Sequence, residues 1–251
     1  MNTARATVPV LGTAATGSLH DLAVCGQLPD HQRMDHATLD WITSHPPKGP
    51  QPPSPLPRQR LLLPEPKWFA TPEGPAGLHG ILHNARVSLL TGLLCEQHGL
   101  DHRTTMTLRA AAAVHDCRRL TDRDDPDHGQ RAAVWFLKHH DAVGAQAGIT
   151  SSAGAAVRAA TALQLHATDH ERFTIAERRA YQRTALWADL LKTADALDRF
   201  RLPLARWWPD LTRLRIAPAT WMAPLAHQLV IRSERALLDG ATHHQALAHS
   251  L

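Results

Sequence analysis

The sequence predicts an all-α protein. From about residue 75 onward, apolar residues recur at the three- and four-residue spacing of helices that face a core. The segment 174–177, Thr-Ile-Ala-Glu, has the Thr-x-x-Glu form of a capping box, which marks the start of a helix. No stretch shows a convincing alternation of apolar and polar residues, the period-two pattern of a half-buried strand. Helices are therefore expected to form the whole core.

Five helices are expected in this region, at 77–99, 103–116, 129–140, 151–170 and 174–201. The first carries leucine and isoleucine at helical spacing, and Gly99 stands where a C-terminal cap belongs. The fourth is rich in alanine and leucine, and good helix formers follow the capping box in the fifth. Four prolines are expected to divide the remaining tail into shorter helical pieces: Pro203, Pro209, Pro218 and Pro224.

A proline-rich stretch predicts a boundary near the amino-terminal end. Residues 44–60 hold seven prolines in seventeen positions, and proline favours extended backbone both at its own position and at the preceding one. We therefore divide the chain into a leader, 1–45, a linker, 46–66, and a helical domain, 67–251. The leader is expected to be poorly ordered or to dock as a small accessory piece. The linker could recruit a partner as a polyproline II segment or serve as a passive tether.

Composition excludes several classes of protein. The formal net charge is +4, and no dense Lys/Arg run indicates a surface for a nucleic acid polymer. No run of eighteen apolar residues indicates a membrane span, and the first thirty residues lack the pattern of a signal peptide. Three widely spaced cysteines without a C-x-x-C motif favour a reduced, cytoplasmic setting. A small anionic ligand remains compatible with this charge, and the oligomeric state is left open.

Polar residues with the chemistry of metal ligands lie on the apolar helices. His79, His83 and Arg86 stand at i, i+4 and i+7, so one helical face carries all three. The doublet His115-Asp116 closes the segment 103–116 directly after Ala110 to Val114, where burial is expected. An uncompensated imidazole and carboxylate would be costly there, and a divalent cation would compensate both.

Further candidates follow at intervals of about one helix. His128 opens the third helix, His166 lies near the end of the fourth, and Asp195 sits in the middle of the fifth. Each would come from a different helix and converge inside the bundle, as metal ligands in helical bundles commonly do. Imidazole and carboxylate together suit Fe, Mn, Co or Zn, and suit Mg alone less well.

In this order the motifs resemble those of the HD-domain superfamily, which is named for a metal-binding His-Asp doublet. The resemblance covers roughly residues 77–201 and is carried by HNARV (83–87), AAVHD (112–116), DDPDHG (124–129), the lone His166 and KTADALDR (192–199). The order H…HD…H…H…D is similar to the two-metal branch of that superfamily. No G-Y-P motif follows, which separates the chain from the branch that cleaves cyclic-di-GMP.

The resemblance implies an HD-type helical bundle with a metal site in its centre and two divalent transition metals, Fe, Mn or Co. It implies that His83, His115 and Asp195 hold the first metal and that Asp116 bridges both. It further implies that His128 and His166 hold the second metal.

Several residues are predicted to meet the substrate. Lys192 stands one helical turn before Asp195 and shares its face, so it is the strongest phosphate-binding candidate and is predicted, with Asp116, to take part in catalysis. The other substrate candidates are His79, Arg86 and Arg119. Structural interpretations also remain: packing for His79, an ion pair for Arg86, solvated charge for Arg119 and Lys192, a hydrogen-bonded helix end for His115-Asp116, a cap for His166, and an ion pair with Arg199 for Asp195.

Three functions are compatible with this pattern. The first is a metal-dependent phosphohydrolase that attacks a nucleotide or other small phosphate ester with a hydroxide activated by two metals. The second is a di-iron HD-type oxygenase acting on a phosphonate- or polyol-like substrate, because the same ligands hold iron in some members of the superfamily. The third is a non-catalytic ligand sensor, which the complete set of six ligand positions disfavours.

Overall fold

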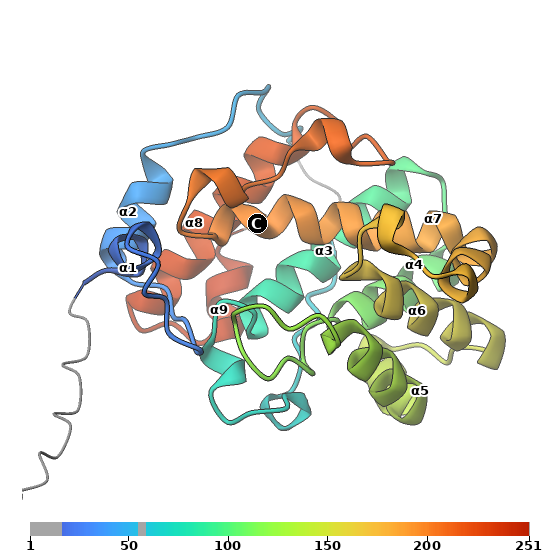
Figure 1. The fold of residues 1–251 in the computed structure, drawn as a ribbon. Helices are drawn as coiled ribbons and strands as arrows, with labels where there is room; N and C mark the ends of the chain where they lie inside the picture. Colours follow the sequence, from blue (N-terminus) through green and yellow to red (C-terminus); the bar gives the residue numbers. More distant parts are fainter. Residues whose placement is uncertain (1–16, 55–58, 251) are drawn as a thin grey trace, which may run out of the picture.

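The computed structural model describes residues 17–54 and 59–250, and within them it contains helices and no strand. The all-α class predicted from the sequence is confirmed for these residues. Nine α-helices form a bundle around one large apolar core, with the long α7 running through its centre (Figure 1). Their bounds are α1 Leu19–Val24, α2 His36–Thr43, α3 Ile81–Gln97, α4 His102–Ala112, α5 His128–Ala147, α6 Ala153–His166, α7 Ile175–Leu197, α8 Met222–Leu238 and α9 His243–Ala248.

The capping box at the start of α7 is confirmed. The Thr174 hydroxyl accepts the Glu177 backbone N–H at 3.2 Å, and the Glu177 carboxylate accepts the Thr174 N–H at 2.8 Å. After α7 the chain turns through three short 3₁₀ helices, η4 Asp198–Arg201, η5 Ala205–Trp207 and η6 Leu211–Arg213, and another, η3 His170–Arg172, precedes α7. The prolines of the tail fall among these turns, except Pro224, which lies in the first turn of α8 where no N–H donor is needed.

Several helix ends differ from those expected. The helix α3 begins at Ile81 and not at 77, α6 covers Ala153–His166 and not 151–170, and α7 ends at Leu197 and not at 201. Two further differences concern α4 and α5. The second helix was expected to run to residue 116, but α4 ends at Ala112, and the backbone of 113–118 forms a tight turn with bonds such as Val114 N–H to Ala111 O at 3.0 Å. The third was expected to end at 140, but α5 continues to Ala147. Gly148, at φ +75°, ends α5, because this left-handed conformation suits glycine. The extra turns of α5 bury Val143 and Ala147 in the core.

Residues 17–45 dock on the bundle. The helices α1 and α2 contact each other, and α2 packs on α8. The His227 ring lies 3.0 Å from the Ile42 carbonyl, and Arg235 forms an ion pair with Asp40 at 2.6 Å. Part of the linker also packs on the domain, because Leu62 is buried and the Gln146 side chain donates to the Leu63 carbonyl at 2.6 Å. Residues 1–16 of the leader and 55–58 of the linker lie outside the described residues.

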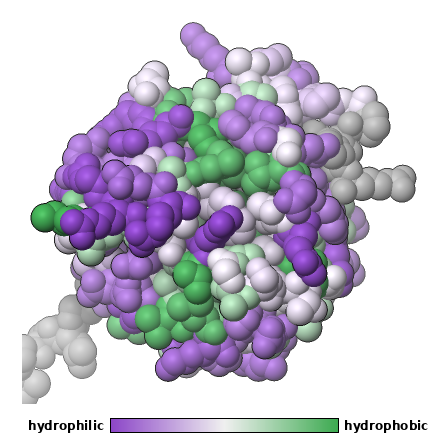
Figure 2. Space-filling model, turned by 90° about the vertical axis from the view of Figure 1, so that its right-hand side faces the viewer, coloured by the Kyte–Doolittle hydropathy of each residue, from purple (hydrophilic) through white to green (hydrophobic). Residues whose placement is uncertain are grey.

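The surface is mainly polar. Figure 2 shows one face on which hydrophilic side chains predominate and apolar groups form separate patches. Such patches are ordinary on folded proteins. No helix in the described part of the chain is both long enough and apolar enough to cross a membrane. The apolar material is instead concentrated where α3, α4, α6 and α7 meet, and the candidate ligands stand on α3, α6 and α7, at the start of α5 and in the turn after α4.

Candidate metal centre

Five segments bring the six predicted ligands to one place in the core. The ligands come from α3, the turn after α4, the first residue of α5, the last residue of α6, and the last two turns of α7. Five of the six are at least nine-tenths buried: His83, His115, Asp116, His128 and His166. The two groups of three that could hold a metal ion share one member, Asp116.

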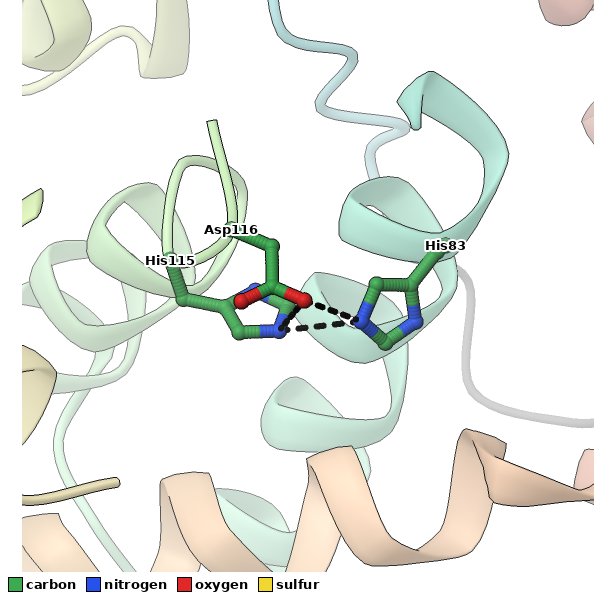
Figure 3. Close-up of side chains that lie close together, drawn as sticks. All are labelled: His83, His115 and Asp116. Atoms are coloured by element: carbon green, nitrogen blue, oxygen red, sulfur yellow. Dashed lines mark hydrogen bonds and ion pairs between the residues drawn. The ribbon is translucent and has the colours of Figure 1, made fainter. Parts of the chain in front are cut away.

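The first cluster lies between α3 and the turn after α4. The Nε2 atoms of His83 and His115 are 3.1 Å apart, and Asp116 Oδ2 lies 3.3 Å from the former and 3.8 Å from the latter (Figure 3). Asp195 Oδ1 approaches from α7, at 3.4 Å from His83 Nε2 and 3.6 Å from His115 Nε2. Asp195 therefore lies beside both histidines, although the group of three that could hold an ion here is His83, His115 and Asp116.

The second cluster uses the other oxygen of the same carboxylate. Asp116 Oδ1 lies 3.1 Å from His128 Nε2 and 3.5 Å from His166 Nε2. The two Nε2 atoms are themselves 3.1 Å apart. Asp116 thus points one oxygen at each pair of histidines, which is the arrangement of a bridging carboxylate.

The outer nitrogen of each histidine fixes its tautomer. His83 Nδ1 lies 2.8 Å from Asp198 Oδ2, and the other three Nδ1 atoms face backbone carbonyls. These pairs are His115 with Ala112 at 2.8 Å, His128 with Asp125 at 2.5 Å, and His166 with Leu163 at 2.6 Å. Because carbonyl and carboxylate oxygens only accept, each Nδ1 carries a proton and donates it outward, which leaves each Nε2 facing the centre.

Among the residues that the structure describes, one of the inward-facing oxygens has no hydrogen-bond partner. Within the described part of the chain, the buried Asp116 Oδ1 has no hydrogen bond. Lone pairs of neutral imidazoles and carboxylate oxygens repel at these distances unless a proton or a cation lies between them. The donor set and the orphaned oxygen therefore fit divalent transition metals.

Electrostatics keep the carboxylates ionised. Burial works to raise the pKa of Asp116, but His115, His128 and Arg119 outweigh it and hold this pKa well below its usual range. The pKa of Asp195 is likewise low, because His115 and His83 outweigh the effect of burial. Burial lowers the pKa of His166 to about 4, so this ring stays neutral at pH 7. The ionised carboxylates of Asp116 and Asp195 and the neutral imidazole of His166 are groups that can bind cations.

A buried ionic chain stands behind His83. Asp198 binds the His83 ring through Oδ2 and accepts from Arg86 Nε at 2.7 Å. Arg86 in turn donates to Glu234 at 2.8 Å and to Ser233 at 3.0 Å on α8. Arg86 and Asp198 are fully buried, so this chain locks the first ligand to α7 and α8.

Close backbone contact between α5 and α6 brings the second pair of histidines together. A Cβ at Gly129 would lie 2.8 Å from the Leu163 carbonyl oxygen and 3.0 Å from that of Gln164. Glycine therefore allows the start of α5 to lie against the last turn of α6. The neighbouring His128 and the terminal His166 consequently meet.

A cavity of about 280 Å³ opens onto the centre. Its wall includes ligands of both clusters and six other polar side chains: His79, Arg119, Asp169, Lys192, Arg199 and Arg201. Lys192 donates to the His166 carbonyl at 3.0 Å and to the Thr168 carbonyl, and burial lowers its pKa. Arg119 lies 3.9 Å from Asp116 Oδ1. The predicted substrate residues Lys192 and Arg119 therefore border the cavity.

His79 borders the cavity with a partner of its own. Its Nδ1 lies 2.8 Å from Asp122 Oδ1, while Asp122 Oδ2 accepts the Gln32 N–H at 2.7 Å. Burial, with the nearby Arg119 and Arg201, lowers the pKa of His79 to about 3 despite Asp122. The ring is therefore neutral and fixed in orientation.

Two sequence interpretations need correction. Arg86 was named as a substrate candidate, but it lies behind His83 and not in the cavity wall, and its guanidinium is fully buried in ion pairs. The structural alternative for Arg86 describes its position. For Asp195 an ion pair with Arg199 was considered; in the described residues Asp195 instead pairs with His83 and His115.

Sequence reasoning missed three supporting residues. Asp198 stands three positions after Asp195, and this helical spacing was the available signal. Asn84, next to His83, accepts the Asp116 N–H at 3.1 Å and so ties the doublet to α3. Asp122 had no local signal for its bond to His79, because the two are 43 positions apart.

Comparisons with protein-family models, curated proteins and solved structures found no match to this chain. What the structure shows in its described residues is an all-helical fold with two buried groups of histidine and aspartate that could each hold a metal ion.

Proposed function

We propose that this chain is a metal-dependent phosphohydrolase that acts on a nucleotide or another small phosphate ester. The observation that carries the proposal is the convergence of four histidine Nε2 atoms on the two oxygens of one buried carboxylate, Asp116. Two cations bound in such a site lower the pKa of a water and neutralise charge on phosphate oxygens. The donor set suits Fe, Mn or Co.

The side chains around the centre support an anionic substrate. Lys192 and Arg119 both border the cavity: Lys192 donates to the His166 carbonyl, and Arg119 lies 3.2 Å from the His128 ring. Their cationic groups would bind phosphate oxygens and orient the ester. The fixed, neutral His79 would accept a hydrogen bond from the substrate or from water at the same wall.

The test begins with the metal content of protein purified without added metal. We expect close to two transition metal ions per chain, and phosphate release from p-nitrophenyl phosphate or nucleoside monophosphates under anaerobic conditions with Mn or Co. Asp116→Asn should abolish metal binding and phosphate release. Asp141→Asn, which changes an exposed aspartate on α5, should alter neither metal content nor phosphate release. A chain that retains only traces of metal would overturn the proposal.

The same measurements separate the alternatives. Two magnetically coupled irons with substrate-dependent oxygen consumption would replace the hydrolase with the oxygenase. Tight binding of a phosphate ester by a metal-loaded chain that turns over none of the esters would replace it with the ligand sensor.

A further inference from the structure

A second, outer chamber adjoins the metal centre. It has a volume of about 440 Å³ and shares five residues with the inner cavity: His166, Asp169, Lys192, Asp195 and Arg199. Both volumes lie near the lower part of the range of small-molecule sites, so the inner cavity has room for little more than one small group. The outer chamber extends along the 3₁₀ turns that follow α7, and its wall there includes Trp208, Pro209 and Leu214.

Four arginines line this chamber. Arg199 comes from η4, Arg206 from η5, Arg213 from η6, and Arg215 from the segment after it. Among the described residues, none of the four forms an ion pair with a carboxylate. Arg206 and Arg215 instead lie over the rings of Trp207 and Tyr181, with guanidinium carbons 5.3 and 5.4 Å from the ring centroids.

Most of the acids in the same wall are already engaged. Asp189 accepts the Tyr181 hydroxyl at 2.6 Å and lies 3.0 Å from the His170 ring. Asp210 caps η6 by accepting the Thr212 hydroxyl at 2.6 Å, and Asp195 faces the metal centre. The exposed Asp169 and Glu171 remain, with Asp169 3.9 Å from Arg172. The wall thus holds five carboxylates against the four arginines and Lys192, but among the described residues none of these carboxylates lies within ion-pair distance of the four arginines.

We propose that the substrate carries two anionic groups joined by a short organic skeleton. The reactive phosphate lies at the metal centre, and Arg213 and Arg215 bind the second anionic group in the outer chamber. The skeleton lies against Trp208 and Leu214. This inference rests on the proposed phosphohydrolase function, since it places the reacting phosphate at the metals. It also explains why the two connected cavities share Lys192, which borders the cavity of the reactive phosphate and the chamber of the second anionic group.

The test measures binding of hydrolysis-resistant phosphonates to the metal-loaded full chain by calorimetry. The probes are propylphosphonate, propane-1,3-diphosphonate and hexane-1,6-diphosphonate at fixed ionic strength. We expect at least one diphosphonate to bind about tenfold more tightly than propylphosphonate, because charge-assisted arginine–phosphate bonds are strong. Arg213→Glu combined with Arg215→Glu should remove this advantage and leave propylphosphonate affinity unchanged.

A matched control carries the same change in net charge elsewhere. Arg103→Glu combined with Arg158→Glu alters two exposed arginines on α4 and α6 that line neither chamber, and it should preserve the advantage of the diphosphonate. Equal affinity for the mono- and diphosphonates in metal-loaded wild type would overturn the second anionic position. The proposal would also be overturned if the control variant lost its tighter binding of the diphosphonate to the same extent as the Arg213/Arg215 variant. Metal analysis of the same samples tests the proposed function separately: a sample without metal overturns that function.

Discussion

At the scale of single residues, Asp116 has the most demanding environment in the molecule. Its two oxygens serve two pairs of imidazoles, its backbone N–H is held by Asn84, and its side chain is 4 % exposed. A carboxylate in this position is not stabilised by hydration, and cations bound to it would explain why it lies in the core.

Asp198→Leu tests the ionic chain behind His83. Removing this carboxylate leaves the buried Arg86 guanidinium with one of its two carboxylate partners, Glu234, and breaking a buried ion pair costs about 3–5 kcal/mol of folding free energy. We expect urea denaturation to show a loss of that size. Adding Arg86→Met should recover part of it, because the second change removes the uncompensated charge. Strictly additive losses in the two single variants and the double variant would contradict the coupling.

At the scale of helices, the site depends on how chain ends meet. The doublet lies beyond the end of α4 in a turn, His128 begins α5, and His166 ends α6. Three of the four histidines therefore donate Nδ1–H to a carbonyl three residues earlier in the chain. A helix end leaves carbonyls without intrahelical partners, so it can orient a ligand at no cost to the helix.

Gly129→Ala tests the contact of α5 with α6. The added methyl group would collide with the Leu163 and Gln164 carbonyl oxygens, so the two helices would separate and His128 would move away from His166. We expect metal content to fall from two ions toward one per chain, because the first cluster does not use this contact. Gly154→Ala on α6, where a Cβ meets nothing within 4 Å, should retain two ions. An equal loss of metal in Gly129→Ala and Gly154→Ala would contradict the explanation that close contact of α5 with α6 brings His128 to His166.

At the scale of the whole molecule, the ligands connect segments that are distant in the chain. The centre joins α3, the turn after α4, α5, α6 and α7, while the ionic chain extends the connection to α8. A metal ion that binds the folded state and not the unfolded state stabilises the folded state by mass action. Metal should therefore stabilise most of the bundle at once.

Removal of metal with a chelator should lower the thermal midpoint. A cation present at a thousand times its Kd contributes about 4 kcal/mol, which corresponds to about 10 °C for a chain of this size. Differential scanning calorimetry with and without chelator measures the shift. The Asp116→Asn variant should show no shift, and a shift that persists in this variant would place the stabilising ion elsewhere.

The sequence by itself determined the helical class, the capping box of α7 and the six candidate ligands. Their signals are local: apolar periodicity, the spacing of Thr174 and Glu177, and polar residues on apolar helices. The tertiary structure decided which of the neighbouring groups serve the site. Asp198 binds His83 across 115 positions of chain, Arg86 lies behind the centre, and four arginines line one chamber. These relations depend on how distant helices pack, and periodicity along one helix carries no information about the partner that another helix brings.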